Sequence, residues 1–214
     1  MKLVSINVGG PREIEWNGRV VRTSIFKEPV VGPVRVGKLN LAGDEQSDLT
    51  FHGGVDKAVY AYPSEHYAYW RKQLPDLEFP WGAFGENLTT EGLSEKDVKI
   101  GDRLGIGSAR FVVTQPRTPC SKLCVRFQRP DMVKRFHQSG RMGFYLAVIQ
   151  EGEVAAGDAI EWFPEETPSL SVSEIARLYT TEQGDSKLLR QAVEIAALSE
   201  GWRKHFHRHL QRTS

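Results

Sequence analysis

Residues 115–123 read Gln-Pro-Arg-Thr-Pro-Cys-Ser-Lys-Leu and place Cys120 between two cations, where an expected strand passes into an expected helix. The β-branched run 110–114 before this stretch predicts the strand. Backbone N–H groups at a helix N-terminus favour a thiolate, and so do the charges of Arg117 and Lys122. Because the thiolate is the form that binds metals and attacks electrophiles, Cys120 is a candidate functional residue. The alternative is a small buried residue that happens to be cysteine.

Composition limits the class of protein. The 214 residues suffice for one large domain, or for one domain and a small appendage. A hydrophobic content of 40% and a charged content of 26% are typical of a soluble globular protein. The net charge of +1 argues against bulk nucleic-acid binding, and no apolar stretch reaches transmembrane length. The two cysteines, Cys120 and Cys124, form no disulfide framework, so we expect a cytoplasmic protein without a nucleic-acid or membrane partner.

The first part of the chain, residues 1–164, carries short β-type runs separated by glycine and proline. These runs are residues 3–8, 19–25, 34–39, 58–62, 104–106, 110–114, 144–149 and 159–163. Their short, even spacing predicts a mainly antiparallel, barrel-like sheet, so the fold class is mainly β with some α.

Two helices are expected within this first domain, over residues 64–74 and 121–138, the second broken at Pro130. Residues 165–169 read as a linker, and residues 169–214 predict a C-terminal three-helix domain. Ser171, Asp185 and Ser199 are the expected N-caps of its helices. Such a small bundle is marginally stable alone, so we expect it to dock on the barrel.

Basic residues concentrate around Cys120. Between residues 109 and 135 there are seven of them and one acidic residue, Asp131. Such a cluster would attract an anionic ligand, above all a phosphate. A basic outer face of a helix is the alternative for its C-terminal half, but Arg117 and Lys122 flank the cysteine directly.

Two further loops could approach a ligand. Residues 51–60 read Phe-His-Gly-Gly-Val-Asp-Lys-Ala-Val-Tyr, in which Gly53 and Gly54 permit close backbone approach and an anion-binding nest. His52 and Lys57 could add side-chain donors. Residues 82–88 read Gly-Ala-Phe-Gly-Glu-Asn-Leu, which ordinary turn chemistry would explain equally well.

Taken together, three segments resemble the signatures of MOSC domains, the module shared with the C-termini of molybdenum cofactor sulfurases. They are residues 52–59, His-Gly-Gly-Val-Asp-Lys-Ala-Val, residues 84–88, Phe-Gly-Glu-Asn-Leu, and residues 115–120, Gln-Pro-Arg-Thr-Pro-Cys. Their order and the C-terminal three-helix appendage are similar to the bacterial YiiM-like branch. The resemblance covers essentially the whole chain.

The resemblance implies a β-barrel-like fold that binds the molybdopterin form of the molybdenum cofactor, with Cys120 as the thiolate ligand of the metal. It also implies reduction of N-hydroxylated bases, such as 6-hydroxylaminopurine, to the amine. The electrons would come from a separate flavoprotein or similar donor. Whether the protein forms a homodimer is left open.

The same resemblance assigns the candidate site residues. Those with a catalytic role would be Cys120, His52 and Glu86. Those that bind the cofactor would be Cys120, Arg117, Lys122, Lys57, His52, Gly53, Gly54, Asp56 and Asn87. A competing interpretation is a sulfur carrier in which Cys120 bears a persulfide, and a purely structural interaction protein ranks third.

Overall fold

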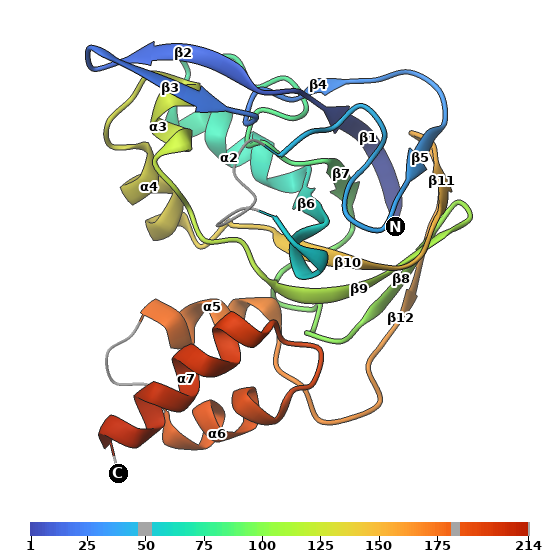
Figure 1. Cartoon of the computed structure of the whole chain (residues 1–214), viewed down its shortest axis with the longest axis vertical. Helices are drawn as coiled ribbons and strands as arrows, with labels where there is room; N and C mark the ends of the chain where they lie inside the picture. Colours follow the sequence, from blue (N-terminus) through green and yellow to red (C-terminus); the bar gives the residue numbers. More distant parts are fainter. Residues whose placement is uncertain (47–52, 181–184, 214) are drawn as a thin grey trace.

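An eight-stranded sheet forms the centre of the structure, a computed structural model that describes residues 1–46, 53–180 and 185–213 (Figure 1). Its strand order is β12-β8-β9-β10-β6-β7-β1-β4. The strands are β1 (Lys2–Val8), β4 (Glu28–Pro29), β6 (Val59–Pro63), β7 (Leu88–Glu91), β8 (Arg103–Ile106), β9 (Ala109–Pro116), β10 (Phe144–Gln150) and β12 (Ile160–Phe163). All neighbours pair antiparallel except β6 and β7, which are parallel. The predicted mainly antiparallel sheet is confirmed.

The sheet closes on itself between β1 and β12. Lys2 of β1 bridges Ala159, next to β12. The backbone N–H of Leu3 donates to the carbonyl of Asp158 at 2.9 Å, and that of Ile160 donates to the carbonyl of Met1 at 3.1 Å. These bonds satisfy the edges that an open sheet would expose, so the strands form a barrel.

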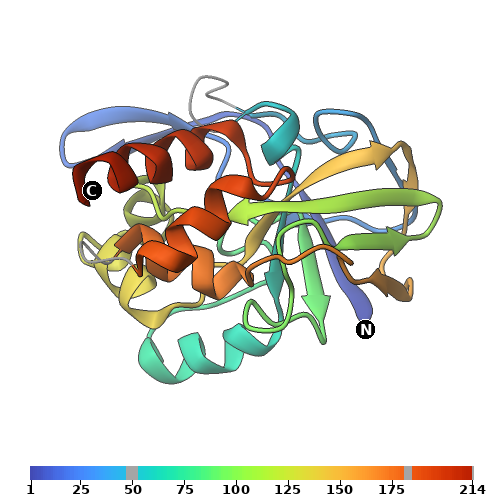
Figure 2. The same ribbon diagram turned by 90° about the horizontal axis from the view of Figure 1, so that it is seen from below.

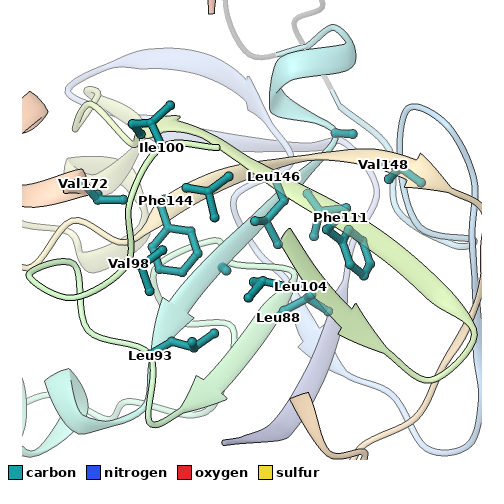
Figure 3. Packing of buried hydrophobic residues seen from close by; sticks show 14 of the residues in the cluster. Leu88, Leu93, Val98, Ile100, Leu104, Phe111, Phe144, Leu146, Val148 and Val172 are labelled. Atoms are coloured by element: carbon teal, nitrogen blue, oxygen red, sulfur yellow. The ribbon is translucent and has the colours of Figure 1, made fainter. Parts of the chain in front are cut away.

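Apolar side chains fill the barrel, because alternate residues of each strand point inward. In β9, Ala109, Phe111 and Val113 are buried, whereas Arg110 and Val112 between them are partly exposed. Figure 3 shows Phe111 packing with side chains from neighbouring strands, among them Leu104 and Leu146. This alternation explains why the strands were predictable from sequence.

Two short pairs flank the barrel. β5 (Val34–Val36) pairs with β11 (Gly152–Val154). β2 (Arg12–Trp16) and β3 (Arg19–Thr23) form a hairpin, in which Asn17 and Gly18 have φ of 51° and 70°. Asn-Gly is the preferred sequence for such a two-residue turn. The sequence analysis predicted the second strand of this hairpin but not the first.

Three helices cover one side of the barrel: α2 (Glu65–Gln73), α3 (Lys122–Phe127) and α4 (Met132–Ser139). The expected break near Pro130 is confirmed, since α3 ends at Gln128 in a left-handed conformation with φ of 51°. The helices enclose a second apolar cluster rich in aromatic rings. Its rings include Tyr62, Tyr67, Trp70, Phe84, Phe127 and Phe136.

The C-terminal segment forms the three expected helices, α5 (Val172–Thr180), α6 (Ser186–Glu194) and α7 (Glu200–Thr213). Ser171 caps α5 in a reciprocal arrangement: its Oγ accepts from the N–H of Glu174 at 3.2 Å, and its N–H donates to the Glu174 carboxylate at 2.8 Å. Asp185 caps α6 by accepting from the N–H of Lys187 at 2.8 Å.

These helices dock on the barrel, as expected (Figure 2). Ile175 and Leu178 of α5 belong to the same buried cluster as the barrel interior. The N–H of Ile100 donates to the carbonyl of Leu170 at 3.0 Å, which ties the segment before α5 to the barrel. No helix in the described ranges is long and apolar enough to cross a membrane.

Candidate functional site

A cleft opens on the barrel near the end of β9, beside the β2–β3 hairpin. Its lining includes five residues that the sequence analysis singled out: Lys57, Asn87, Arg117, Cys120 and Lys122. These residues come from three separate segments, which the folded barrel brings together.

Cys120 lies between the end of β9 and the start of α3. Its side chain is partly exposed, and its carbonyl accepts from the N–H of Leu123 at 3.0 Å. The helix begins at Lys122 with Ser121 as its N-cap, so the cysteine stands just before the first turn, as the sequence predicted. Cys124, one turn later, is buried and its Sγ lies 3.4 Å from the carbonyl of Pro130.

Arg117 is the most unusual cation in the cleft because its side chain is only 5% exposed. Its guanidinium lies over the rings of Tyr60, at 5.0 Å from the centroid, and Phe136, at 5.2 Å. Its Nη1 is buried and has no hydrogen-bond partner in the part of the chain that the structure describes. A buried unpaired donor costs about 1–3 kcal/mol, and an anionic ligand would satisfy it.

The charge of Arg117 persists despite this burial. Burial acts to lower the pKa of the guanidinium, but electrostatic attraction to the anionic forms of the ionisable side chains of Tyr60 and Cys120 outweighs it, and the pKa lies above its ordinary value. The cleft therefore holds a permanent positive charge beside the thiol.

Lys57 and Lys122 border the same cleft. The Nζ of Lys122 donates to the carbonyl of Arg22 in β3 at 3.1 Å, so one of its three donors holds the hairpin. Lys57 is the last residue of the short helix η1 (Val55–Lys57). The pKa of Lys57 lies below its ordinary value, because burial lowers it more than the charge of Asp56 raises it. Both ammonium groups add positive charge where an anion would bind.

The glycine loop before η1 lies next to Lys57. Gly54 adopts a φ of 100°, which favours glycine, and its carbonyl accepts from the N–H of Lys57 at 3.0 Å. The carbonyl of Asp56 accepts from the Thr114 hydroxyl at 2.6 Å, so η1 is held on β9. Gly53 and Asp56 are partly buried, and neither they nor Gly54 are among the cleft-lining residues. His52 lies outside the described residues.

Glu86 lies behind the residues that line the cleft. It is fully buried and is not among the residues that line the cleft. Its carboxylate accepts from the Tyr67 hydroxyl and from the backbone N–H groups of Gly82, at 2.9 Å, and Phe84, at 3.1 Å. Burial raises its pKa, and these donors oppose that rise. In the structure Glu86 organises the 82–88 turn, and a catalytic role for it stays a prediction.

Asn87 lines the cleft, yet its side-chain amide is already engaged. Its Oδ1 accepts from the N–H of Tyr60 at 3.1 Å, and its Nδ2 donates to Asp44 at 2.9 Å. Asn87 is thus a link between β6 and the 41–46 loop.

A buried ion pair in the same cleft was not predicted from the sequence. Lys27 and Asp44 both line it, with side chains 8% and 1% exposed, and the Lys27 ammonium donates to Oδ1 of Asp44. Oδ1 of Asp44 also accepts from the N–H of Gly9 at 3.0 Å. The two residues stand in loops without a recognisable motif, so only their contact in the fold reveals them.

Three of the other basic residues around Cys120 lie away from the cleft. Arg129 and Arg135 both pair with Asp131, at 3.3 Å and 2.5 Å, on an outer helix face. Lys134 is exposed on α4. Of the seven basic residues, only Arg117 and Lys122 line the cleft.

Comparisons with known proteins place this architecture in a family. Residues 48–161 match the MOSC domain, and residues 170–213 match the YiiM-like 3-alpha helix domain. The chain therefore belongs to the MOSC family. Its C-terminal helices define the YiiM-like subdivision within that family.

Individual relatives agree with this placement. The uncharacterized protein YflK of Bacillus subtilis is 39% identical, with 95% of this chain and 92% of that protein aligned. The crystal structure of YiiM from Geobacillus stearothermophilus is 40% identical, covers 98% of both chains and has a TM-score of 0.82. A protein of Gibberella moniliformis named "Reductase" is 34% identical over 83% of this chain, which spans 32% of that longer protein.

Proposed function

We propose that this protein is a molybdenum cofactor-dependent oxidoreductase that reduces N-hydroxylated bases, such as 6-hydroxylaminopurine, to the amine. The electrons come from a separate flavoprotein or similar donor. The observation that carries the proposal is the buried Nη1 of Arg117, which has no hydrogen-bond partner among the described residues and lies in the same cleft as a partly exposed cysteine. The relative named "Reductase" supports the redox class.

The cleft fits a phosphate-bearing cofactor that brings its own metal. In the described ranges no three His, Cys, Asp or Glu side chains gather to hold a metal ion, whereas Cys120 supplies one soft donor. Cys120 would supply this soft thiolate to a molybdenum ion that the pterin dithiolene brings into the cleft. Arg117, Lys57 and Lys122 would bind the phosphate by charge-assisted hydrogen bonds.

When bound, the cofactor supplies the two electrons that break the N–O bond. The protein's own part is to hold and orient both reactants. The partly exposed Tyr145 lines the cleft, and its ring would contact a planar base; Tyr60 packs against it, with ring centroids 5.4 Å apart. Because the Tyr60 hydroxyl donates to the carbonyl of Met142 at 2.7 Å, the ring is fixed in place.

The test is elemental and pterin analysis of protein made in a cofactor-competent host, followed by turnover of 6-hydroxylaminopurine with an artificial reductant. We expect stoichiometric molybdenum and pterin and formation of the amine. Protein that carries a persulfide on Cys120 without molybdenum would instead identify a sulfur carrier. Loaded protein that reduces no N-hydroxylated base would refute the substrate class.

A further inference from the structure

The reaction proposed above needs acids in the cleft. Reduction of R–NHOH to R–NH₂ and H₂O consumes two electrons and two protons. The family resemblance implied a catalytic role for His52 and Glu86, but His52 lies outside the described residues and Glu86 does not line the cleft. Among the other lining groups, the Tyr60 hydroxyl already donates to the carbonyl of Met142, and a guanidinium does not release its proton.

Lys27 has the chemistry and the position that are required. Within the ranges that the structure describes, its ammonium has Asp44 as its hydrogen-bond partner. An ammonium carries three N–H groups, so two remain for a molecule bound in the cleft that Lys27 lines.

The neighbours of Lys27 hold its ammonium in place. Asp44 accepts from the N–H of Gly9 at 3.0 Å and from Nδ2 of Asn87 at 2.9 Å, so its carboxylate is fixed on both oxygens. The backbone of Lys27 also packs tightly, because a Cβ on Gly82 would lie 2.8 Å from the carbonyl oxygen of Lys27. A general acid contributes most when it is positioned in this way.

We propose, resting on the proposed function, that Lys27 is the proton donor to the oxygen that leaves the N-hydroxylated base, and that Asp44 and Asn87 position it. A proton passes from Nζ to the hydroxyl oxygen while the N–O bond breaks, and the oxygen departs as water. The electron pair that stays on nitrogen would come from the bound molybdenum cofactor, which the flavoprotein-type donor would reduce again. A second proton from solvent completes the amine, and Lys27 regains its proton from solvent.

The electrostatics of Lys27 agree with this role. Burial lowers the pKa of its ammonium, and the charges of Asp44 and Glu86 only partly restore it. The ammonium therefore releases a proton more readily than an exposed lysine does. The other charged groups on the cleft are Glu45, Lys57, Arg117 and Lys122.

The decisive variant is Lys27→Arg, which keeps the cation and the carboxylate contact but cannot donate a proton. Lys38→Arg is the control for the change of lysine to arginine, because Lys38 is an exposed lysine outside the cleft whose Nζ donates to the carbonyl of Val148 at 2.8 Å. Both variants are loaded with cofactor. Pterin content, melting temperature and the pH profile of kcat with an artificial reductant are then measured.

We expect Lys27→Arg to retain pterin, to melt near the wild type, and to lose about 10²–10⁴-fold in kcat, the range for a missing general acid. The control should match the wild type. The fall of wild-type kcat at alkaline pH should also be absent from the residual activity of Lys27→Arg. A Lys27→Arg protein with the kcat of the wild type would overturn the role of Lys27. A Lys27→Arg protein that loses its pterin but keeps its kcat per bound pterin would also overturn it.

A second measurement does not depend on turnover or on the variant's folding. In ¹⁵N-lysine-labelled wild-type protein without cofactor, the Nζ resonance of Lys27 should titrate below that of an ordinary lysine, and adding 6-hydroxylaminopurine should shift it. An unshifted resonance would contradict contact with the base. Loaded wild type that reduces no N-hydroxylated base would refute the proposed function and this inference with it. An active Lys27→Arg would refute this inference alone.

Discussion

Arg117 and Tyr60 form a cation–π pair at the base of the cleft, with the guanidinium carbon 5.0 Å from the ring centroid. The pair explains how a charged side chain is held inside the protein although its Nη1 has no hydrogen-bond partner within residues 1–46, 53–180 and 185–213. The aromatic face offsets part of the desolvation cost and leaves Nη1 available for an anion.

We predict that Arg117→Met reduces cofactor retention. A hydrogen bond to a charged group contributes about 1.5–3 kcal/mol, so pterin affinity should fall roughly tenfold to a hundredfold. Lys122→Met should have a smaller effect, because its Nζ already donates to Arg22. Pterin content per protein measures both. Lys134→Met, on the exposed face of α4, is the control, and equal pterin in all three variants would refute the assignment.

Substitution of the two cysteines should affect two different properties, molybdenum content and stability. Cys120→Ser replaces a soft ligand with a hydroxyl, so molybdenum content should collapse while the melting temperature stays close to the wild type. Cys124→Ser should retain molybdenum and lose about 1 kcal/mol of stability, since a buried hydroxyl can still donate to the nearby Pro130 carbonyl. A fully loaded Cys120→Ser protein would exclude Cys120 as the ligand.

The buried ion pair of Lys27 and Asp44 should matter for stability far more than an exposed one. Asp44→Ala leaves a buried ammonium without its partner, which costs about 3–5 kcal/mol. Glu28→Ala breaks the exposed contact with Arg12 and should cost less than about 1 kcal/mol. Urea denaturation of both variants tests this difference. Similar losses would show that Lys27 is stabilised by other groups.

Acid should weaken a second buried contact, between Glu95 and His66. Burial acts to raise the pKa of Glu95, but the hydrogen bond and charge of His66 and the N–H of Gly143 bring it below the ordinary 4.5. A carboxylate with a lowered pKa stabilises the fold above the unfolded value and loses that contribution as pH falls through the folded value.

We therefore expect Glu95→Gln to cost about 1–3 kcal/mol at pH 7. The difference from wild type should shrink as the pH falls below 4.5, when followed by urea denaturation at several pH values. The exposed Glu91→Gln is the control. A difference that is independent of pH would show that the charge of Glu95 contributes nothing.

Local sequence determined most of the elements. The strand at 110–114 was predictable because its inward and outward residues alternate, and the helix break near Pro130 because proline lacks an N–H donor. β2 was missed because charged residues occupy much of Arg12–Trp16, and its strand conformation depends on pairing with β3. Its Asn-Gly turn was a usable signal.

The sequence by itself also determined the environment of Cys120, since Arg117 and Lys122 are its neighbours along the chain. The tertiary structure alone decided that Lys57 joins them, that Glu86 turns away into the aromatic cluster, and that Lys27 meets Asp44. The physical reason lies in the range of the interactions. Strand and helix preferences depend on residues a few positions apart, whereas a buried ion pair forms only when folding removes two distant loops from water together.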